Sequence, residues 1–231
     1  MNYLQLCQRV AQESGKIAGV TPTAETGQVG RLKVVVDQVA SAWRFVQNHH
    51  GDSWRWMRST FSSNTTSGSA CYTAASFGLT EHAKWITERG SLSIYLTSTG
   101  VSDEGALTAE DWQVWHQTYN KGSQTNGRPT MYAVSNANEL CFGPIPDDDY
   151  TVNGEYMKAA VTLAANTDTP ACPARFHEII VWRALMFLHQ YDEAPTVPYQ
   201  QCVINYNEYM ARLEIDQLPL KANASAAGPL A

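Results

Sequence analysis

The chain has 231 residues, of which 44% are hydrophobic and 16% are charged, and its net charge is −6. A chain of this length and apolar content can bury a real core, which excludes wholesale disorder. The low charged fraction predicts that part of the surface is covered by partner proteins. Residues 1–10 lack the pattern of a signal peptide, and no apolar stretch approaches the ~20 residues of a membrane span. We therefore expect a soluble chain without a membrane partner.

Charge is unevenly distributed along the chain. Residues 1–60 carry seven Lys/Arg against four Asp/Glu, whereas residues 61–231 carry nine against eighteen. There is no basic run. Because phosphate neutralisation supplies most of the affinity of nucleic-acid-binding proteins, we expect that the chain does not bind DNA or RNA.

The five cysteines have wide and irregular spacing: Cys7, Cys71, Cys141, Cys172 and Cys202. An odd number at such spacing is a poor disulfide framework, and no CxxC or Cys/His pair has zinc spacing. The sequence predicts free, mostly buried thiols in a reducing cytosol.

Two helices are predicted near the N-terminus. The first is marked by apolar residues at helical spacing, namely Tyr3, Leu6, Cys7 and Val10. Gly15 and Gly19 end it. The second covers about residues 28–48, and its buried stripe comprises Leu32, Val35, Val36, Val39, Trp43 and Val46.

The middle of the chain predicts a small sheet. Residues 54–75 are rich in Ser, Thr and Gly, with short extended pieces at 60–61 and 71–73. Thr108, followed three residues later by Asp111, predicts the start of a short helix. Longer strands are predicted at residues 91–97, 130–134, 139–142 and 150–163, with a bulge or bend at Asn153-Gly154 in the last.

The C-terminal third is helical again. Residues 176–191 are apolar nearly all round, which is typical of a helix at a bundle centre or a subunit interface. Another helix follows at about residues 199–218. The predicted fold is therefore α+β, with a helical bundle from residues 1–50 and 173–218 and an antiparallel β-rich insertion at about residues 54–165. Residues 1–219 form a single domain in this interpretation, followed by a flexible tail, residues 220–231.

Signatures of catalysis are missing. The sequence contains no GxxxxGK[ST], GxGxxG, HExxH or GxSxG motif, so we expect neither enzymatic activity nor a cofactor. Asp147, Asp148 and Asp149 could hold a hard cation, but they lack calcium-loop spacing, which favours a charged turn. Capping or surface roles are favoured over metal binding for the remaining groups, which are His49-His50 with Asp52, and His177-Glu178.

Trp54 and Trp56 flank Arg55, which could indicate base stacking beside a cation. At period two, however, both indoles point to one face of an extended segment. This spacing favours a place in the core or at an interface.

Several short stretches recur together in a characteristic order. They are TSTGVSDE (97–104), GRP (127–129), LCFGPIP (140–146), YTVNGEY (150–156), DTP (168–170), FHEIIVWRALM (176–186) and DQLP (216–219). In this order the chain resembles the head-to-tail adaptor (connector) proteins of tailed bacteriophages, notably of short-tailed phages. The resemblance covers nearly all of residues 1–219, and the Gly-Pro-Ile-Pro tip and the 176–186 helix are its most specific parts.

The resemblance implies a structural protein of the virion head–tail junction, made in the host cytoplasm. Such adaptors form a ring, usually of about twelve copies, beneath the portal protein. The ring extends the DNA channel and carries tail or nozzle proteins, and double-stranded DNA passes through without sequence-specific binding. The acidic balance of residues 61–231 would keep this DNA from sticking, because like charges repel.

Two segments are candidates for contact with partners, and for the first the resemblance implies the role. The C-terminal tail is the candidate for portal docking, through Leu220, Lys221, Pro229, Leu230 and Ala231; the alternative is an idle terminus. The candidate loop for contact with a tail protein or a ring neighbour comprises Pro144, Ile145, Pro146, Asp147, Asp148 and Asp149.

Two functions of other classes stay open at this point. One is a carbohydrate- or ligand-binding module that stacks its ligand on exposed tryptophans of the small sheet. The other is a metal-dependent hydrolase built around residues 147–149 and His177.

Overall fold

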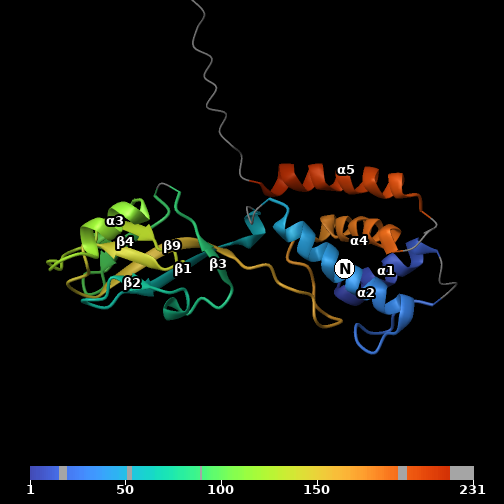
Figure 1. Ribbon diagram of the computed structural model, residues 1–231, viewed down its shortest axis with the longest axis horizontal. Coiled ribbons are helices and arrows are strands. Elements are labelled where there is room, and N and C mark those ends of the chain that lie inside the picture. Colours follow the sequence, from blue (N-terminus) through green and yellow to red (C-terminus); the bar gives the residue numbers. More distant parts are fainter. Residues whose placement is uncertain (16–19, 51–53, 89, 192–196, 219–231) are drawn as a thin grey trace, which may run out of the picture. The chain divides into compact units, whose positions relative to one another are not determined.

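The computed structural model describes residues 1–15, 20–50, 54–88, 90–191 and 197–218 (Figure 1). The chain divides into two compact units. The helical unit comprises Met1–Trp56 and Ala160–Ala231, and the β unit comprises Met57–Ala159. This arrangement confirms the predicted α+β class and the β-rich insertion between helical segments. The predicted tail, residues 220–231, lies outside the described residues.

The helical unit is built around one central helix. Its helices are α1 (Tyr3–Ser14), α2 (Gly30–Asn48), α4 (Glu178–Tyr191) and α5 (Tyr199–Gln217). Helix α4 packs against the other three, and in Figure 1 it lies between α5 and the pair α1–α2. Its buried residues therefore occur on nearly all sides, and they include Ile179, Ile180, Val181, Ala184, Leu185 and Leu188. The nearly all-apolar helix of the sequence is thus a bundle centre.

Local chemistry explains where α1 begins and ends. The Asn2 side chain accepts a hydrogen bond from the Gln5 backbone N–H, and the Gln5 side chain accepts one from the Asn2 backbone N–H. This reciprocal pair satisfies two donors that a helix start leaves free. Gly15 ends the helix with a φ of 66°, a left-handed conformation that glycine adopts without steric cost. Gly19 lies outside the described residues.

The β unit contains two sheets. The first has the order β1-β9-β4-β5, with β3 also paired to β9, and its strands are β1 (Arg58–Asn64), β3 (His82–Trp85), β4 (Ser93–Leu96), β5 (Gly105–Ala106) and β9 (Tyr150–Lys158). The second has the order β2-β8-β7-β6, with β2 (Cys71–Tyr72), β6 (Thr108–Ala109), β7 (Met131–Val134) and β8 (Leu140–Gly143). All pairs are antiparallel except β6 with β7.

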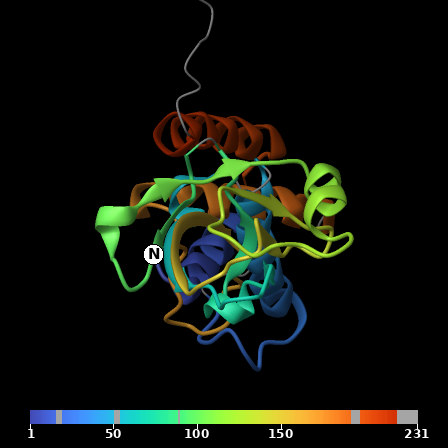
Figure 2. The same cartoon turned by 90° about the vertical axis from the view of Figure 1, so that its left-hand side faces the viewer.

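An aromatic core joins the two sheets of the β unit. Phe61 and Val152 contribute to it from the first sheet, and Tyr132 and Phe142 from the second. Figure 2 shows this unit facing the viewer, with the short helix α3 (Trp112–Tyr119, yellow-green) beside the strands. Short 3₁₀ turns complete the element list of the two units: Arg55–Met57, Ala75–Phe77, Val101–Asp103 and Ala174–Phe176.

Two local predictions are wrong. Helix α3 is capped by Asp111, whose side chain accepts from the Gln113 backbone N–H, whereas Thr108 lies in β6. Strand β9 ends at Lys158 rather than at residue 163, and it keeps continuous register with β1 through Asn153-Gly154. Gly154 serves packing instead of a bulge, because a Cβ there would lie 2.7 Å from Phe61 Cε1.

The prediction of five free cysteines is also wrong. Cys71 and Cys141 form a disulfide across β2 and β8, whereas Cys7, Cys172 and Cys202 are free and buried as expected. The two bridged residues are directly opposite each other, next to the hydrogen-bonded pair Ala70 and Phe142. Cys71 and Cys141 are therefore a non-hydrogen-bonded pair of the antiparallel ladder. Side chains of such a pair lie closer together than those of a hydrogen-bonded pair, which favours a disulfide.

Candidate functional site

Aromatic and cationic side chains gather on the surface of the helical unit. The Arg183 guanidinium of α4 lies 3.7 Å from the ring centre of Phe45, 4.4 Å from that of Phe187 and 5.6 Å from that of Tyr206. These four residues, contributed by α2, α4 and α5, form what we call the Arg183 cluster. Cation–π contacts hold the guanidinium in place, while its buried Nε makes no hydrogen bond.

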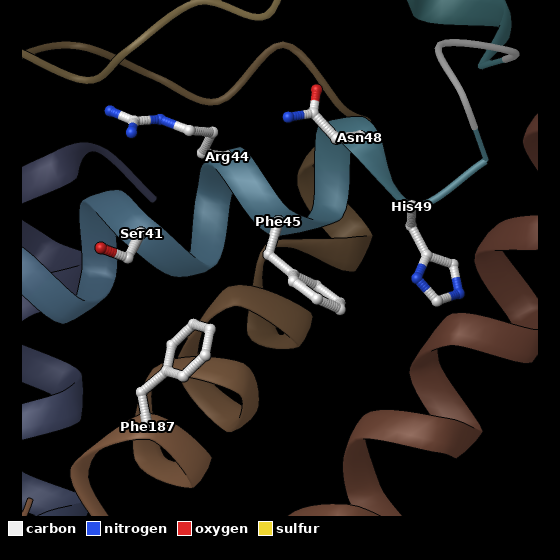
Figure 3. A pocket seen from close by; sticks show the side chains of 6 residues that line it. All are labelled: Ser41, Arg44, Phe45, Asn48, His49 and Phe187. Carbon is white, nitrogen blue, oxygen red and sulfur yellow. The ribbon is translucent and has the colours of Figure 1, made fainter. Parts of the chain in front are cut away.

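A pocket of about 410 Å³ opens beside this cluster (Figure 3). Phe45 and Phe187 both line it, with their ring centres 6.3 Å apart in an edge-to-face arrangement, and His49 follows the last residue of α2. The remaining lining residues are Ser41, Arg44 and Asn48. Aromatic rings beside polar side chains are typical of surfaces that receive a side chain of another molecule.

A second pocket, of about 570 Å³, also belongs to the helical unit. The Arg175 guanidinium lies 4.9 Å from the ring centre of Phe176 and pairs with Asp216. Ile215 of α5 lines the same pocket and is 81% exposed. The helical unit therefore presents two different patches that each combine an arginine with a phenylalanine.

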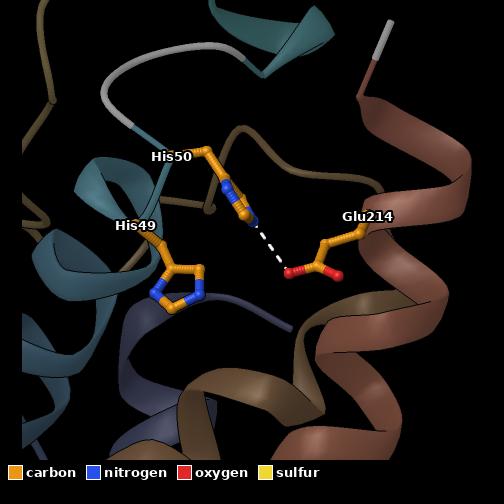
Figure 4. A group of neighbouring side chains, drawn as sticks. All are labelled: His49, His50 and Glu214. Carbon is orange, nitrogen blue, oxygen red and sulfur yellow. Dashed lines mark hydrogen bonds and ion pairs between the residues drawn. The ribbon is translucent and has the colours of Figure 1, made fainter. Parts of the chain in front are cut away.

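Two histidines and a glutamate meet at the end of α2. His50 Nε2 lies 2.8 Å from Glu214 Oε1, and one donor atom each of His49, His50 and Glu214 falls within 4.8 Å of the others (Figure 4). Burial, and next the neighbouring His50, lower the pKa of His49. His49 and His50 directly follow α2, which ends at Asn48, and the centres of the two rings lie 4.7 Å apart.

The aspartates of the tip loop are structural groups. Asp147 Oδ1 accepts from the Tyr150 hydroxyl at 2.7 Å, and Asp149 Oδ1 accepts from the Ser67 backbone N–H at 3.2 Å. Asp148 Oδ1 accepts from the Asp149 backbone N–H. All three aspartates are exposed, and they form no group of potential metal ligands among the described residues. The arrangement supports the charged-turn interpretation.

His177 is buried in the helical unit with both ring nitrogens engaged. Nδ1 lies 2.7 Å from the N-terminal amino group of Met1, and Nε2 lies 3.1 Å from the Cys172 carbonyl oxygen. Burial lowers the pKa of His177, which favours the neutral ring that donates at Nε2 and accepts at Nδ1. Neither nitrogen is left to serve a metal, so the hydrolase alternative loses the histidine on which it depended.

The tryptophans are also internal. All seven lie in the described part of the chain, and each is buried or half-buried. Trp54 is fully buried, donates to the Val46 carbonyl oxygen at 2.9 Å and stacks on Trp56. This confirms the core interpretation of Trp54. The exposed tryptophans required by the ligand-binding alternative are therefore not present.

Sequence reasoning missed the residues that carry this surface. Arg183 is the one charged residue within the otherwise apolar stretch of residues 179–188. A single charge in such a helix could have indicated that this residue has a special role. Glu214 is separated from His50 by 164 positions, and no local pattern relates the two. No helix among the described residues has the length and apolar content needed to cross a membrane.

Comparison with known proteins gives one result. No curated protein matches the chain. The sequence model of the SU10 adaptor protein family matches residues 1–229, which is nearly the whole chain. The resemblance to phage adaptors is thereby confirmed, and the chain belongs to the SU10 adaptor family, a family of structural bacteriophage proteins.

Proposed function

We propose that this protein is the head-to-tail adaptor of a short-tailed bacteriophage. About twelve copies assemble into a ring beneath the portal protein, extend the DNA channel and attach tail components. The observation that carries this proposal is the family match over residues 1–229.

The surface of the helical unit supports the ring. A closed ring with cyclic symmetry needs two different, complementary patches on every subunit. The pocket beside Phe45 and the pocket beside Phe176 are separate and differently lined, as such an interface requires. Arginine and aromatic residues are also the types most often found at the energetic centres of interfaces.

The charge of the β unit supports a place near DNA without binding. Residues 57–159 contain six Lys/Arg against eleven Asp/Glu. A net negative surface repels the phosphate backbone and lets DNA slide past. Phages carrying Glu88→Lys and Glu110→Lys should eject DNA more slowly. Ejection at the wild-type rate would count against a channel position for these side chains.

The tail, residues 220–231, is proposed to dock on the portal. Deleting these residues should abolish capture of the portal in a pull-down assay. Undiminished capture would refute the docking role.

The loop of residues 144–149 is proposed to contact a tail protein or a ring neighbour. Its three carboxylates are exposed, while Pro146 is buried and holds the loop through its carbonyl oxygen, which accepts from Gly68 N–H. The double substitution Asp148→Asn and Asp149→Asn should weaken capture of the tail protein. Glu88→Gln, in the same unit but outside the loop, is the matched control.

Mass photometry tests the proposal as a whole. The purified protein is measured alone and after mixing with portal rings of the same phage. The portal mass should rise by about twelve copies of 25.5 kDa. A portal mass that does not change at saturating protein would contradict the adaptor role.

A further inference from the structure

We propose that His49, His50 and Glu214 form a zinc-binding site that clamps the end of α5 to the end of α2. The donor set is the first reason. Two imidazoles and one carboxylate are a recurrent protein ligand set for Zn²⁺, and they are poorly matched to Ca²⁺ or Mg²⁺, which prefer oxygen ligands. The fourth tetrahedral position would be taken by water.

The distances between the donor atoms are the second reason. Zinc–ligand bonds of about 2.0–2.2 Å place the ligand atoms of a tetrahedral site roughly 3.4 Å apart. The His50–Glu214 separation of 2.8 Å must open slightly, and the widest separation in the group, at most 4.8 Å, must close by no more than about 1.4 Å. Side-chain rotation at the exposed His49 and the half-buried His50 and Glu214 can supply changes of this size.

The surroundings of the two rings are the third reason. The His50 ring packs edge-on against Trp54 at 5.0 Å, and Trp54 is itself fully buried and hydrogen-bonded to Val46. The His49 ring lies 4.7 Å from His50 and 5.7 Å from Phe45. Both imidazoles are thus held near the carboxylate before any ion arrives, which lowers the ordering cost of binding.

Only neutral imidazoles and an ionised carboxylate ligate a metal, so zinc affinity at this site should fall as the pH is lowered. Binding would join segments 164 positions apart and would stabilise the folded helical unit in proportion to ion concentration. Without zinc, the His50 ring and the Glu214 carboxylate share a hydrogen bond of 2.8 Å.

Thermal unfolding of the full chain, made without a polyhistidine tag and stripped with a chelator, is the test. Added ZnCl₂ should raise the Tm in a concentration-dependent manner, and MgCl₂ should not. Calorimetric titration with ZnCl₂ should give one ion per chain. Co²⁺ bound at the same site should show the intense visible absorption of a tetrahedral complex.

Variants separate this site from incidental zinc binding. Glu214→Gln and His49→Gln should each raise the Kd for Zn²⁺ by at least about tenfold. Glu208→Gln on the same helix and His116→Gln in the β unit are matched controls that should keep wild-type affinity. Circular dichroism checks that each variant is folded. Equal zinc responses in wild type and Glu214→Gln, or no response in the wild type, would overturn the proposal.

Discussion

The helical unit and the β unit differ in how much aromatic surface they leave accessible. In the β unit, Phe61, Phe77 and Phe142 are buried in a core shared by two sheets. In the helical unit, Phe45 stays 37% exposed and, with Phe187, surrounds the Arg183 guanidinium. Both units bury aromatic rings in their cores, as Trp43 shows for the helical unit, but the helical unit also leaves the Phe45 ring accessible for contact.

Charge follows the same division. The β unit has an excess of five acidic residues, because it contains six Lys/Arg and eleven Asp/Glu. The remaining residues, 1–56 and 160–231, contain ten Lys/Arg and eleven Asp/Glu, so their net charge is close to zero. A balanced surface with Arg–aromatic pockets suits packing against protein, and an acidic surface suits DNA that must move past.

The largest expected effects come from truncating each core. Trp43→Ala in the helical unit and Phe142→Ala in the β unit should each lower the free energy of unfolding by about 3–5 kcal/mol, since both side chains are fully buried. Hydrogen exchange should then accelerate first in the unit that carries the substitution. Uniform acceleration throughout the chain would contradict the division into two units.

Removal of the disulfide should have the next largest effect. The Cys71–Cys141 bridge closes a loop with a sequence separation of 70, so replacing both residues by serine should cost about 2–4 kcal/mol. Urea unfolding measures the change. Reductant should destabilise the wild type and leave the double variant unaffected; equal responses of the two proteins would show that the bridge does not form.

Gly154→Ala tests how tightly the core of the β unit is packed at a single position. The new Cβ would lie 2.7 Å from Phe61 Cε1 and 3.1 Å from Leu92 Cγ, so overpacking should cost about 1–3 kcal/mol. Gly105→Ala, whose Cβ would meet only the Arg128 side chain at 3.5 Å, is the control. Urea midpoints that fall equally in both variants would argue against this close packing.

The smallest expected effect is a pH dependence from His177 of the helical unit. Its folded pKa is lowered by burial, so below the ordinary value of about 6.5 the unfolded chain takes up the proton first. This contribution to stability is complete above that pH and is lost as the pH falls through the folded pKa.

The variant His177→Gln should therefore flatten the slope of stability against pH between about 7 and 5. His116→Gln, at a half-buried position of α3, serves as the control. If His177→Gln leaves the slope of stability against pH unchanged, other groups cause the loss of stability in acid.

Local patterns in the sequence predicted the helices well. The 3.6-residue spacing of Leu6, Cys7 and Val10 and the capping role of Gly15 are properties of neighbours along the chain. Strand β1 was harder to identify, because its Ser- and Thr-rich sequence has no clean alternation and only Phe61 is buried. Its place in the fold depends on pairing with β9, and this pairing is non-local.

Long-range partners account for the remaining errors. Cys71 and Cys141 look unrelated in sequence until β2 and β8 align them. His50 and Glu214, like Arg183 and Phe45, come together only when α2, α4 and α5 pack. The tip loop was recognised correctly as a charged turn, because two prolines and three aspartates act through local backbone chemistry.

Mass photometry of portal rings mixed with paired variants tests the central claim most directly, namely that the helical unit makes the ring contacts. Phe45→Glu disturbs the exposed edge of the Arg183 cluster, and Glu88→Gln changes an exposed side chain of the β unit. We predict that wild type and Glu88→Gln add about twelve copies to the portal, whereas Phe45→Glu adds few or none while remaining folded. Full rings from Phe45→Glu would contradict the claim.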